Sequence, residues 1–142
     1  MREIKFRGKR VDNNEWIYGY YVYHSTFNRH DIWVDGTIGD WHEVVPDTVG
    51  QFTGLHDKNG KDVYEGDIIK SKSSIGTYTI VWDNCGFKKR GNSDAKSAFN
   101  YKNDGIFDIF IYDGDNEEKK DYYKIEVIGN IHENQELLNQ KK

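Results

Sequence analysis

The sequence predicts a predominantly β protein with a single domain over residues 1–142. Aromatic residues are numerous, with 4 tryptophans, 10 tyrosines and 7 phenylalanines, and such side chains favour pleated sheets over helices. The 14 glycines and the single proline divide the chain at short intervals, and most segments between them alternate apolar with polar residues. We therefore expect a series of short strands, in a chain long enough to bury a core without disulfides or metals.

The first predicted element is a hairpin over residues 3–23. Its first strand is expected to carry apolar side chains on one face and basic side chains on the other, because successive side chains of a strand alternate. The basic face consists of Lys5, Arg7 and Lys9. Residues 12–14, Asp-Asn-Asn, supply the turn, since short polar side chains tolerate left-handed backbone and bond to it locally. The aromatic segment 16–23 returns as the second strand.

Two less regular segments follow this hairpin. Residues 32–34 predict a short strand that ends at Asp35-Gly36. Residues 44–46 lead into another strand, in which Pro46 suits only the start or the edge. We expect a loop between these two segments.

The clearest predicted hairpin joins residues 49–55 to residues 63–70. Its connection contains Asn59-Gly60, the strongest short hairpin signal in the sequence, because a tight primed turn needs positive φ at both central residues. Asp67 is expected to act as a turn residue that bonds nearby backbone.

Three more strands are expected, over residues 78–82, 107–112 and 122–130. A short C-terminal helix over residues 133–140 should follow them. The first two of these strands are separated by residues 85–104, where Gly, Asn, Ser, Asp and Lys accumulate, and we expect this connection to be a mobile loop.

Charge and cysteine content restrict the classes of function. The net charge of −4 gives no overall attraction to nucleic acid, whose binders usually carry a domain-scale excess of lysine and arginine. Cys85 is the only cysteine, which excludes an internal disulfide and suits a reducing compartment. The sequence has no apolar run long enough for a membrane helix, and residues 1–6 lack the apolar stretch of a secretion signal. We therefore expect a cytoplasmic protein without a membrane partner.

Histidines and carboxylates are concentrated in the first half of the chain, and such side chains are the ligands of zinc and iron sites. Their spacing matches no metal motif, so we expect no metal and no cofactor. A cryptic metal-dependent enzyme is the alternative, and its candidate ligands are His24, His30, Asp31, His42, Glu43 and His56.

The motifs of common enzymes are missing from the sequence. It contains no nucleophile elbow, no phosphate-binding loop and no dinucleotide fingerprint. Segments 57–60 and 113–118 fail the glycine and glutamate spacing of a helical calcium loop. Cys85 has Lys88, Lys89 and Arg90 near it in sequence, but no acid or histidine partner can be assigned, so we favour an unreactive thiol. We expect no catalytic residues.

The basic first strand and the aromatic second strand form the best candidate for a partner surface. Its residues are Lys5, Arg7, Lys9, Trp16, Tyr18 and Tyr20. Bases could stack on these rings beside cations that bind phosphate, which predicts a single-stranded nucleic-acid binder. Alternatively, the charges protect a sheet edge from unwanted pairing. Our leading hypothesis is a non-enzymatic module that binds a protein or forms a homo-oligomer, because the surplus of aromatic residues is typical of interfaces.

Several blocks of the sequence resemble the YopX family in residues, order and spacing. They are residues 2–8, 16–19, 49–60, 64–69 and 126–134. The resemblance implies a phage or prophage protein in a bacterial host, with a molecular function that is unassigned. It also implies a small β roll or barrel of the Src-homology-three type, with a core about 44–130, additional β hairpins and the short C-terminal helix. Gln135 stands where family members often have proline, and residues 85–101 match no part of the family pattern.

Overall fold

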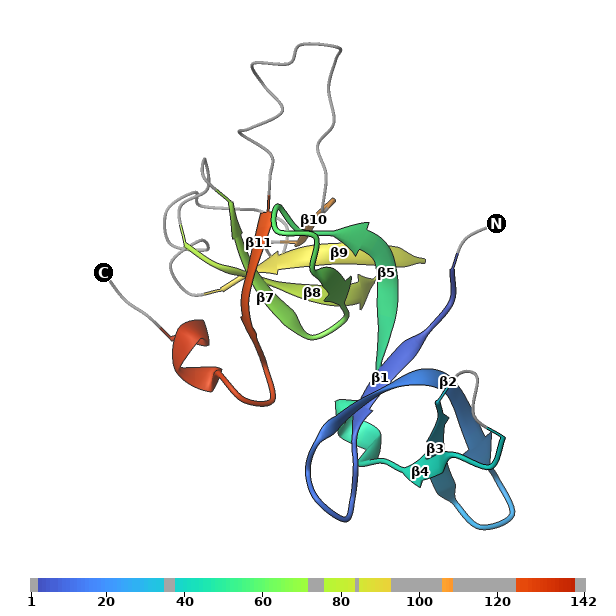
Figure 1. Cartoon of the computed structure of the whole chain (residues 1–142). Helices are drawn as coiled ribbons and strands as arrows, with labels where there is room; N and C mark the ends of the chain where they lie inside the picture. The colour runs from blue at the N-terminus through green and yellow to red at the C-terminus, as the bar shows by residue number, and fades with distance from the viewer. Residues whose placement is uncertain are drawn as a thin grey trace. The chain divides into compact units, whose positions relative to one another are not determined.

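The computed structural model describes residues 3–34, 38–71, 76–83, 85–92, 106–108 and 125–139. It is mainly β with antiparallel sheets, which confirms the predicted class (Figure 1). The chain forms two compact units, the N-terminal unit Met1–Gly54 and the C-terminal unit Leu55–Lys142. The single domain over residues 1–142 stays a prediction. No helix in the described part of the chain is long and apolar enough to cross a membrane.

The N-terminal unit is built from short antiparallel strands and one turn of 3-10 helix. Its elements are β1 (Phe6–Lys9), β2 (Trp16–His24), β3 (Arg29–Trp33), β4 (Trp41–Glu43), η1 (Pro46–Thr48) and the start of β5 (Gly50–His56). The strands lie in the order β4-β3-β2-β1-β5. β1 and β2 confirm the predicted N-terminal hairpin, and Asn14 in their turn has a φ of 62°.

Two predictions for this unit are wrong. Residues 41–43 were expected to lie in a loop but form β4, where Trp41 pairs with Trp33 and Glu43 pairs with Asp31. A strand of three residues is too short to show an alternating pattern in the sequence, so only its partner strand reveals it. Pro46 opens a 3-10 turn rather than a strand, since its fixed φ suits the first position of a helical turn.

The N-terminal unit curls back on itself at the end of β1. The amide of Val45 donates to the carbonyl of Lys9 at 2.8 Å, and the amide of Val11 donates to the carbonyl of Glu43 at 3.0 Å. The inner face of this curl holds Ile32 and Val44, which are 0% and 1% exposed. Figure 1 shows β1 to β4 wrapped in this way.

Gly19 permits the sharpest part of the curl. At this residue β2 changes partner, because Gly19 is the last residue paired with β1 and Tyr20 is the first paired with β3. A Cβ on Gly19 would lie 2.0 Å from the carbonyl oxygen of Trp33. Any side chain here would force the backbones of β2 and β3 apart.

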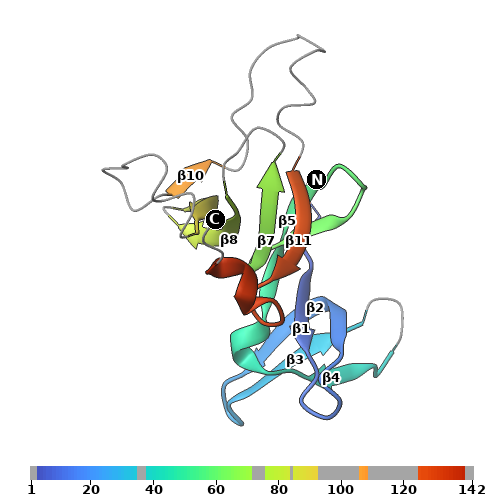
Figure 2. The same ribbon diagram turned by 90° about the vertical axis from the view of Figure 1, so that its left-hand side faces the viewer.

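The C-terminal unit contains a second sheet and the end of β5. Its elements are β6 (Asp62–Tyr64), β7 (Asp67–Ser71), β8 (Tyr78–Asp83), β9 (Gly86–Gly91), β10 (Ile106–Asp108), β11 (Ile125–Asn130) and the 3-10 turn η3 (Gln135–Leu138). β5 and β6 form a hairpin, and the other strands lie in the order β10-β9-β8-β7-β11. Figure 2 shows β7 beside β11. The buried cluster consists of Val63, Ile69, Tyr78, Ile80 and Ile125.

The predictions for the end of the chain had mixed outcomes. β8 and β11 confirm two predicted strands, and β10 overlaps the strand predicted at 107–112. Residues 93–104, 109–112 and 122–124 lie outside the described residues. The expected loop at 85–104 is wrong at its start, because β9 occupies Gly86–Gly91 and pairs with β8. Phe87 packs against the core cluster, and the Lys89 ammonium lies 4.8 Å from the centre of the Tyr78 ring.

Two finer fold predictions are unconfirmed. The described end of the chain has only the 3-10 turn η3, so the helix over residues 133–140 is unconfirmed. In the described residues neither sheet closes into a barrel, and the Src-homology-three-like roll stays a prediction.

The hairpin between β5 and β6 is present, but its turn differs from the predicted one. Gly60 has a φ of 80°, whereas Asn59 is not among the described residues with positive φ, so the turn is not of the primed type. The Asp57 carboxylate instead organises the turn, since one of its oxygens accepts the amides of Asn59 at 2.8 Å and Lys61 at 2.9 Å. Asp67, which is 1% exposed, accepts the amide of Tyr64 at 2.8 Å, which confirms its predicted turn role.

Asp57 also connects this turn to β11. Its second oxygen accepts the amide of Val127 at 3.1 Å, and the amide of Lys58 donates to the carbonyl of Ile125 at 2.9 Å. Burial alone would raise the pKa of Asp57, but the backbone donors Val127, Lys61 and Asn59 outweigh it and hold this pKa below its ordinary value. The ionised carboxylate therefore stabilises the C-terminal unit.

We predict that Gly19→Ala destabilises the protein by about 3 kcal/mol, because the new methyl group collides with backbone rather than with a movable side chain. Urea denaturation followed by circular dichroism measures this change. Gly86→Ala is the matched control, since its Cβ would meet only the flexible end of Lys88 at 3.7 Å. Equal stabilities for the two variants would contradict the role given to Gly19.

We predict that Asp57→Asn lowers the free energy of unfolding by about 2 kcal/mol at neutral pH, because the amide group cannot accept bonds on both sides. The folded-state pKa of Asp57 is lowered, so the stabilisation is complete above the ordinary carboxyl pKa and is lost as the pH falls through the folded value. The difference between wild type and variant should therefore shrink below about pH 4.

Urea denaturation at several pH values tests this second prediction. The control is Asp47→Asn, which replaces an exposed carboxylate in η1. A stability difference that is the same at acid and neutral pH would rule out the proposed role of the ionised carboxylate.

Candidate functional site

The strand register brings the predicted partner residues onto one face of the N-terminal sheet. Lys9 pairs with Trp16, and Arg7 pairs with Tyr18, and directly opposed residues share a face. Alternation along the chain places Lys5 and Tyr20 on this face as well. We call it the outer face, because the buried Ile32 and Val44 lie on the other one.

The three cations of the outer face pack over aromatic rings. The Arg7 guanidinium carbon lies 4.6 Å from the centre of the Trp16 ring, and the Lys9 ammonium lies 5.4 Å from it. The Lys5 ammonium lies 4.5 Å from the centre of the Phe52 ring. Arg7 and Lys9 are 5% and 8% exposed, so their charges present little surface to solvent.

The suggestion that these charges protect a sheet edge is wrong. β1 pairs with β2 on one side and with β5 on the other, so it is an interior strand of the sheet. The basic residues can lie there because their long side chains place apolar methylene groups over the sheet while the charged ends meet rings.

Rings from three strands form a continuous series on the outer face, which we call the aromatic row. It consists of Tyr20, Trp33, Trp41 and His24. Successive ring centres lie 5.8, 5.2 and 6.3 Å apart, and the two indoles stack at 13°. Tyr20 and Trp41 are 45% and 40% exposed, and the neighbouring Tyr18 is 48% exposed.

A buried carboxylate lies next to the aromatic row. Asp31 is 3% exposed and accepts from the Arg29 Nε at 2.8 Å, and the His24 Nε2 lies 3.0 Å from its other oxygen. The hydrogen bond to Asp31 is the main reason that the pKa of Arg29 is raised, and the charge of Glu43 contributes. This cluster fixes the position of the His24 ring at one end of the row.

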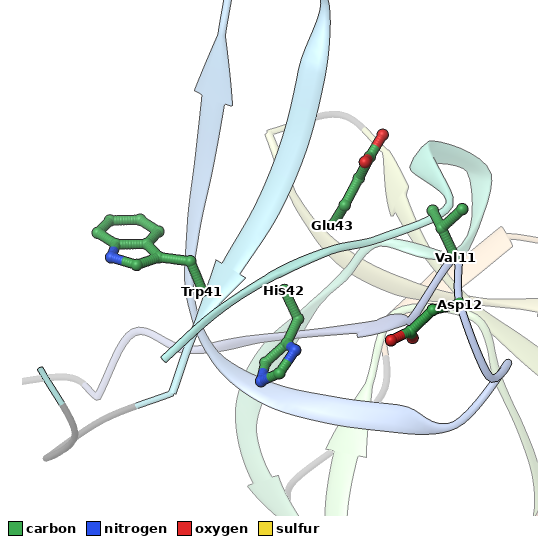
Figure 3. A pocket seen from close by; sticks show the side chains of 5 residues that line it. All are labelled: Val11, Asp12, Trp41, His42 and Glu43. Carbon is green, nitrogen blue, oxygen red and sulfur yellow. The ribbon is translucent and has the colours of Figure 1, made fainter. Parts of the chain in front are cut away.

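A shallow hollow of about 240 Å³ lies beside β4. It is lined by Val11, Asp12, Trp41, His42 and Glu43. Figure 3 shows Asp12 and His42 on one side of β4 and Glu43 on the other. The Arg10 Nε donates to Asp12 at 2.8 Å, and His42 contacts Asp40.

Comparisons with known proteins identify the family of the chain. The family described as YopX protein matches residues 5–139 of the chain. The chain belongs to the YopX family.

One solved structure resembles this YopX-family protein over nearly its full length. It is the crystal structure of protein EF1440 from Enterococcus faecalis, with a TM-score of 0.52 and 22% sequence identity. The similarity covers 98% of this chain and 100% of that chain. At this identity the similarity concerns the fold alone. No curated protein matches the chain.

The metal candidates of this YopX-family protein do not form one cluster, although His24 and Asp31 are in contact. His24 contacts Asp31, His42 contacts Asp40, His56 lies 3.0 Å from Asp62, and the Tyr21 hydroxyl lies 2.6 Å from His30 Nδ1. Among the described residues no three potential ligands come together around a common point. Cys85 is exposed in the turn between β8 and β9, with a φ of 62°.

Sequence reasoning did not assign Trp33, Trp41 and His24 to the candidate surface of this YopX-family protein. Trp41 could not be placed, because the three residues of β4 show no pattern of their own. Once β4 is paired with β3, alternation from Trp33 identifies Trp41 as its neighbour. Trp41 was therefore missed because the strand that pairs with β4 was not known from the sequence, and not because of its residue type.

We predict that the stacked indoles produce an exciton signal in the far-ultraviolet circular dichroism spectrum. Trp41→Leu should abolish the signal and cost about 1 kcal/mol of stability, because an aromatic pair is lost while an apolar side chain remains. Trp82→Leu is the control, since Trp82 is 53% exposed and contacts Phe87 but no second indole. A signal that depends on Trp82 instead of Trp41 would contradict the stacking.

Proposed function

We propose that this YopX-family protein works by binding another protein, without catalysis, through the outer face of its N-terminal unit. The observation that carries the proposal is the exposed aromatic row on a sheet. Large rings that are held in place by strands lose little conformational freedom on binding, and Trp and Tyr dominate the energetics of protein interfaces. Tyr18, Tyr20 and Trp41 offer such exposed rings on one face of the sheet.

The charges beside the row support a protein partner. Asp31 and Glu43 face each other across β3 and β4 on this face, where a phosphate backbone would be repelled. The cations Arg7 and Lys9 are nearly covered, so few positive groups are available for phosphate. A partner protein, by contrast, can present apolar and basic side chains together.

A second copy of the chain is one form that the partner can take, and a homo-oligomer is part of this proposal. We also propose a bacterial cytoplasmic setting and a phage or prophage accessory role. The family membership and the single cysteine support these two points.

A single-stranded nucleic-acid binder is the second candidate, and one observation favours it. Cations and rings alternate across β1 and β2 on the outer face, as in surfaces where bases stack beside phosphate-binding groups. Anisotropy of a fluorescent oligothymidylate tests it over a range of salt concentrations. Binding that weakens with salt and is lost in Lys5→Gln would favour nucleic acid over protein.

We predict that Tyr18→Ser combined with Tyr20→Ser reduces partner binding at least about tenfold, because interface tyrosines contribute more than about 1.4 kcal/mol when buried. Proteins captured from a bacterial lysate are quantified for wild type, for the double variant and for the control Trp82→Ser. A protein that the wild type and the control capture, but the double variant does not, is then purified. Its affinity for the wild type and for the double variant is measured by calorimetry.

Light scattering of the purified wild-type protein tests the self-association form of the proposal. A second copy as partner requires a dimer or larger species that the double variant converts to monomer. The proposal fails if the wild-type protein is monomeric and the double variant retains every captured protein.

A further inference from the structure

Trp41 lies where the aromatic row meets a group of carboxylates. Asp12 and Glu43 line the hollow beside it, and Asp40 precedes it in the chain. We call the carboxylates of Asp12, Asp40 and Glu43 the acidic rim. Neither lysine nor arginine is among the residues that line the hollow. The exposed indole is therefore bordered by negative charge.

The positive groups near the acidic rim balance only part of its negative charge. The pKa of Arg10 is raised by its hydrogen bond to Asp12 and by the charges of Glu15 and Asp40. Arg29 is bonded to Asp31 and is influenced by Glu43. Of the four carboxylates of Asp31 and the acidic rim, those of Asp31 and Asp12 are bonded to guanidinium groups, and that of Asp40 contacts His42. A partner group that covers Trp41 gains from a positive charge.

We propose that Trp41 and the acidic rim bind an arginine side chain of the partner protein, an inference that rests on the proposed function. A guanidinium is planar, weakly hydrated and permanently charged, so it stacks on an indole and bonds a carboxylate at its edge. Glu43 provides that carboxylate, because it lies on the same face of β4 as Trp41, two residues further along the strand.

The N-terminal unit of a second copy is a poor source of this arginine. Arg7 is 5% exposed, and Arg10 and Arg29 are already bonded to Asp12 and Asp31. An arginine from that unit would have to break one of these arrangements. Arg90 in β9 is exposed. The inference names a different protein as the partner, and a dimer that dissociates in Arg90→Gln would overturn this choice.

Peptides of defined charge test the inference on the full-length protein. The probes are an arginine-glycine repeat, a lysine-glycine repeat and a citrulline-glycine repeat of equal length, and binding is measured by nuclear magnetic resonance shifts of the indole NH groups. The arginine peptide should bind at least about fivefold more tightly than the citrulline peptide, because cation and carboxylate contacts are both lost with citrulline.

Variants then locate the binding. Glu43→Gln should weaken the arginine peptide about fivefold, and Trp41→Leu should do the same or more, while the controls Asp47→Asn and Trp82→Leu leave it unchanged. Glu43→Gln keeps the size of the side chain, so it remains informative if Trp41→Leu folds poorly. Equal binding of arginine and citrulline peptides, or full binding by Glu43→Gln, overturns the inference.

The outcome also separates this inference from the proposed function. If a purified partner loses affinity with the Tyr18 and Tyr20 double variant but not with Glu43→Gln, the binding function stands and the arginine site falls. If binding of the arginine peptide depends on Trp41 and Glu43 as stated, the arginine site is supported. This holds even if the Tyr18 and Tyr20 double variant captures the same proteins as the wild type.

Discussion

The closure of the N-terminal curl is the constraint on which the candidate surface depends. The amide of Val45 bonds back to Lys9 at the end of β1, and Ile32 and Val44 are buried on the inner face of the curl. Gly8 and Gly19 lie where a side chain would meet Val44 or the Trp33 carbonyl. Alternation along the strands places Tyr21, Tyr23 and His30 on the face of Ile32, and Tyr20, Trp33 and Trp41 on the opposite face. The aromatic row therefore lies on the face opposite to Ile32 and Val44.

The same constraint explains the position of the basic residues. With the rings on the outer face, Lys5, Arg7 and Lys9 lie among them and cover part of their surface. Long cationic side chains do this well, because their methylene groups shield rings while the charged ends interact with ring faces. The Trp16 and Phe52 rings are thus partly covered by these cations, whereas Tyr18, Tyr20 and Trp41 stay exposed.

Most strands could be predicted from the residue pattern within each strand. The pairings between strands could not be predicted in this way. The N-terminal hairpin, β8 and β11 follow from alternation and turn residues. β4 and β9 were missed, since one has three residues and the other carries Lys88, Lys89 and Arg90, which suggest a loop. The turn at Asn59 was misjudged because Asp57 contacts Val127, which is distant in the sequence. For the same reason Trp33 and Trp41 could not be joined to Tyr20 before the register was known.

The attachment of β11 to the turn at Asp57 has a consequence for how the family can vary. β11 is held by β7, by the Asp57 carboxylate, which accepts the Val127 amide, and by the Lys58 amide, which donates to the Ile125 carbonyl. These partners all lie well before β11 in the sequence. Its location is therefore set independently of the segment that immediately precedes it. The cost of closing a longer connection grows only slowly with length, so insertions before residue 125 leave the sheet intact. We therefore expect sequence added to this connection to leave the buried cluster of the C-terminal unit unchanged.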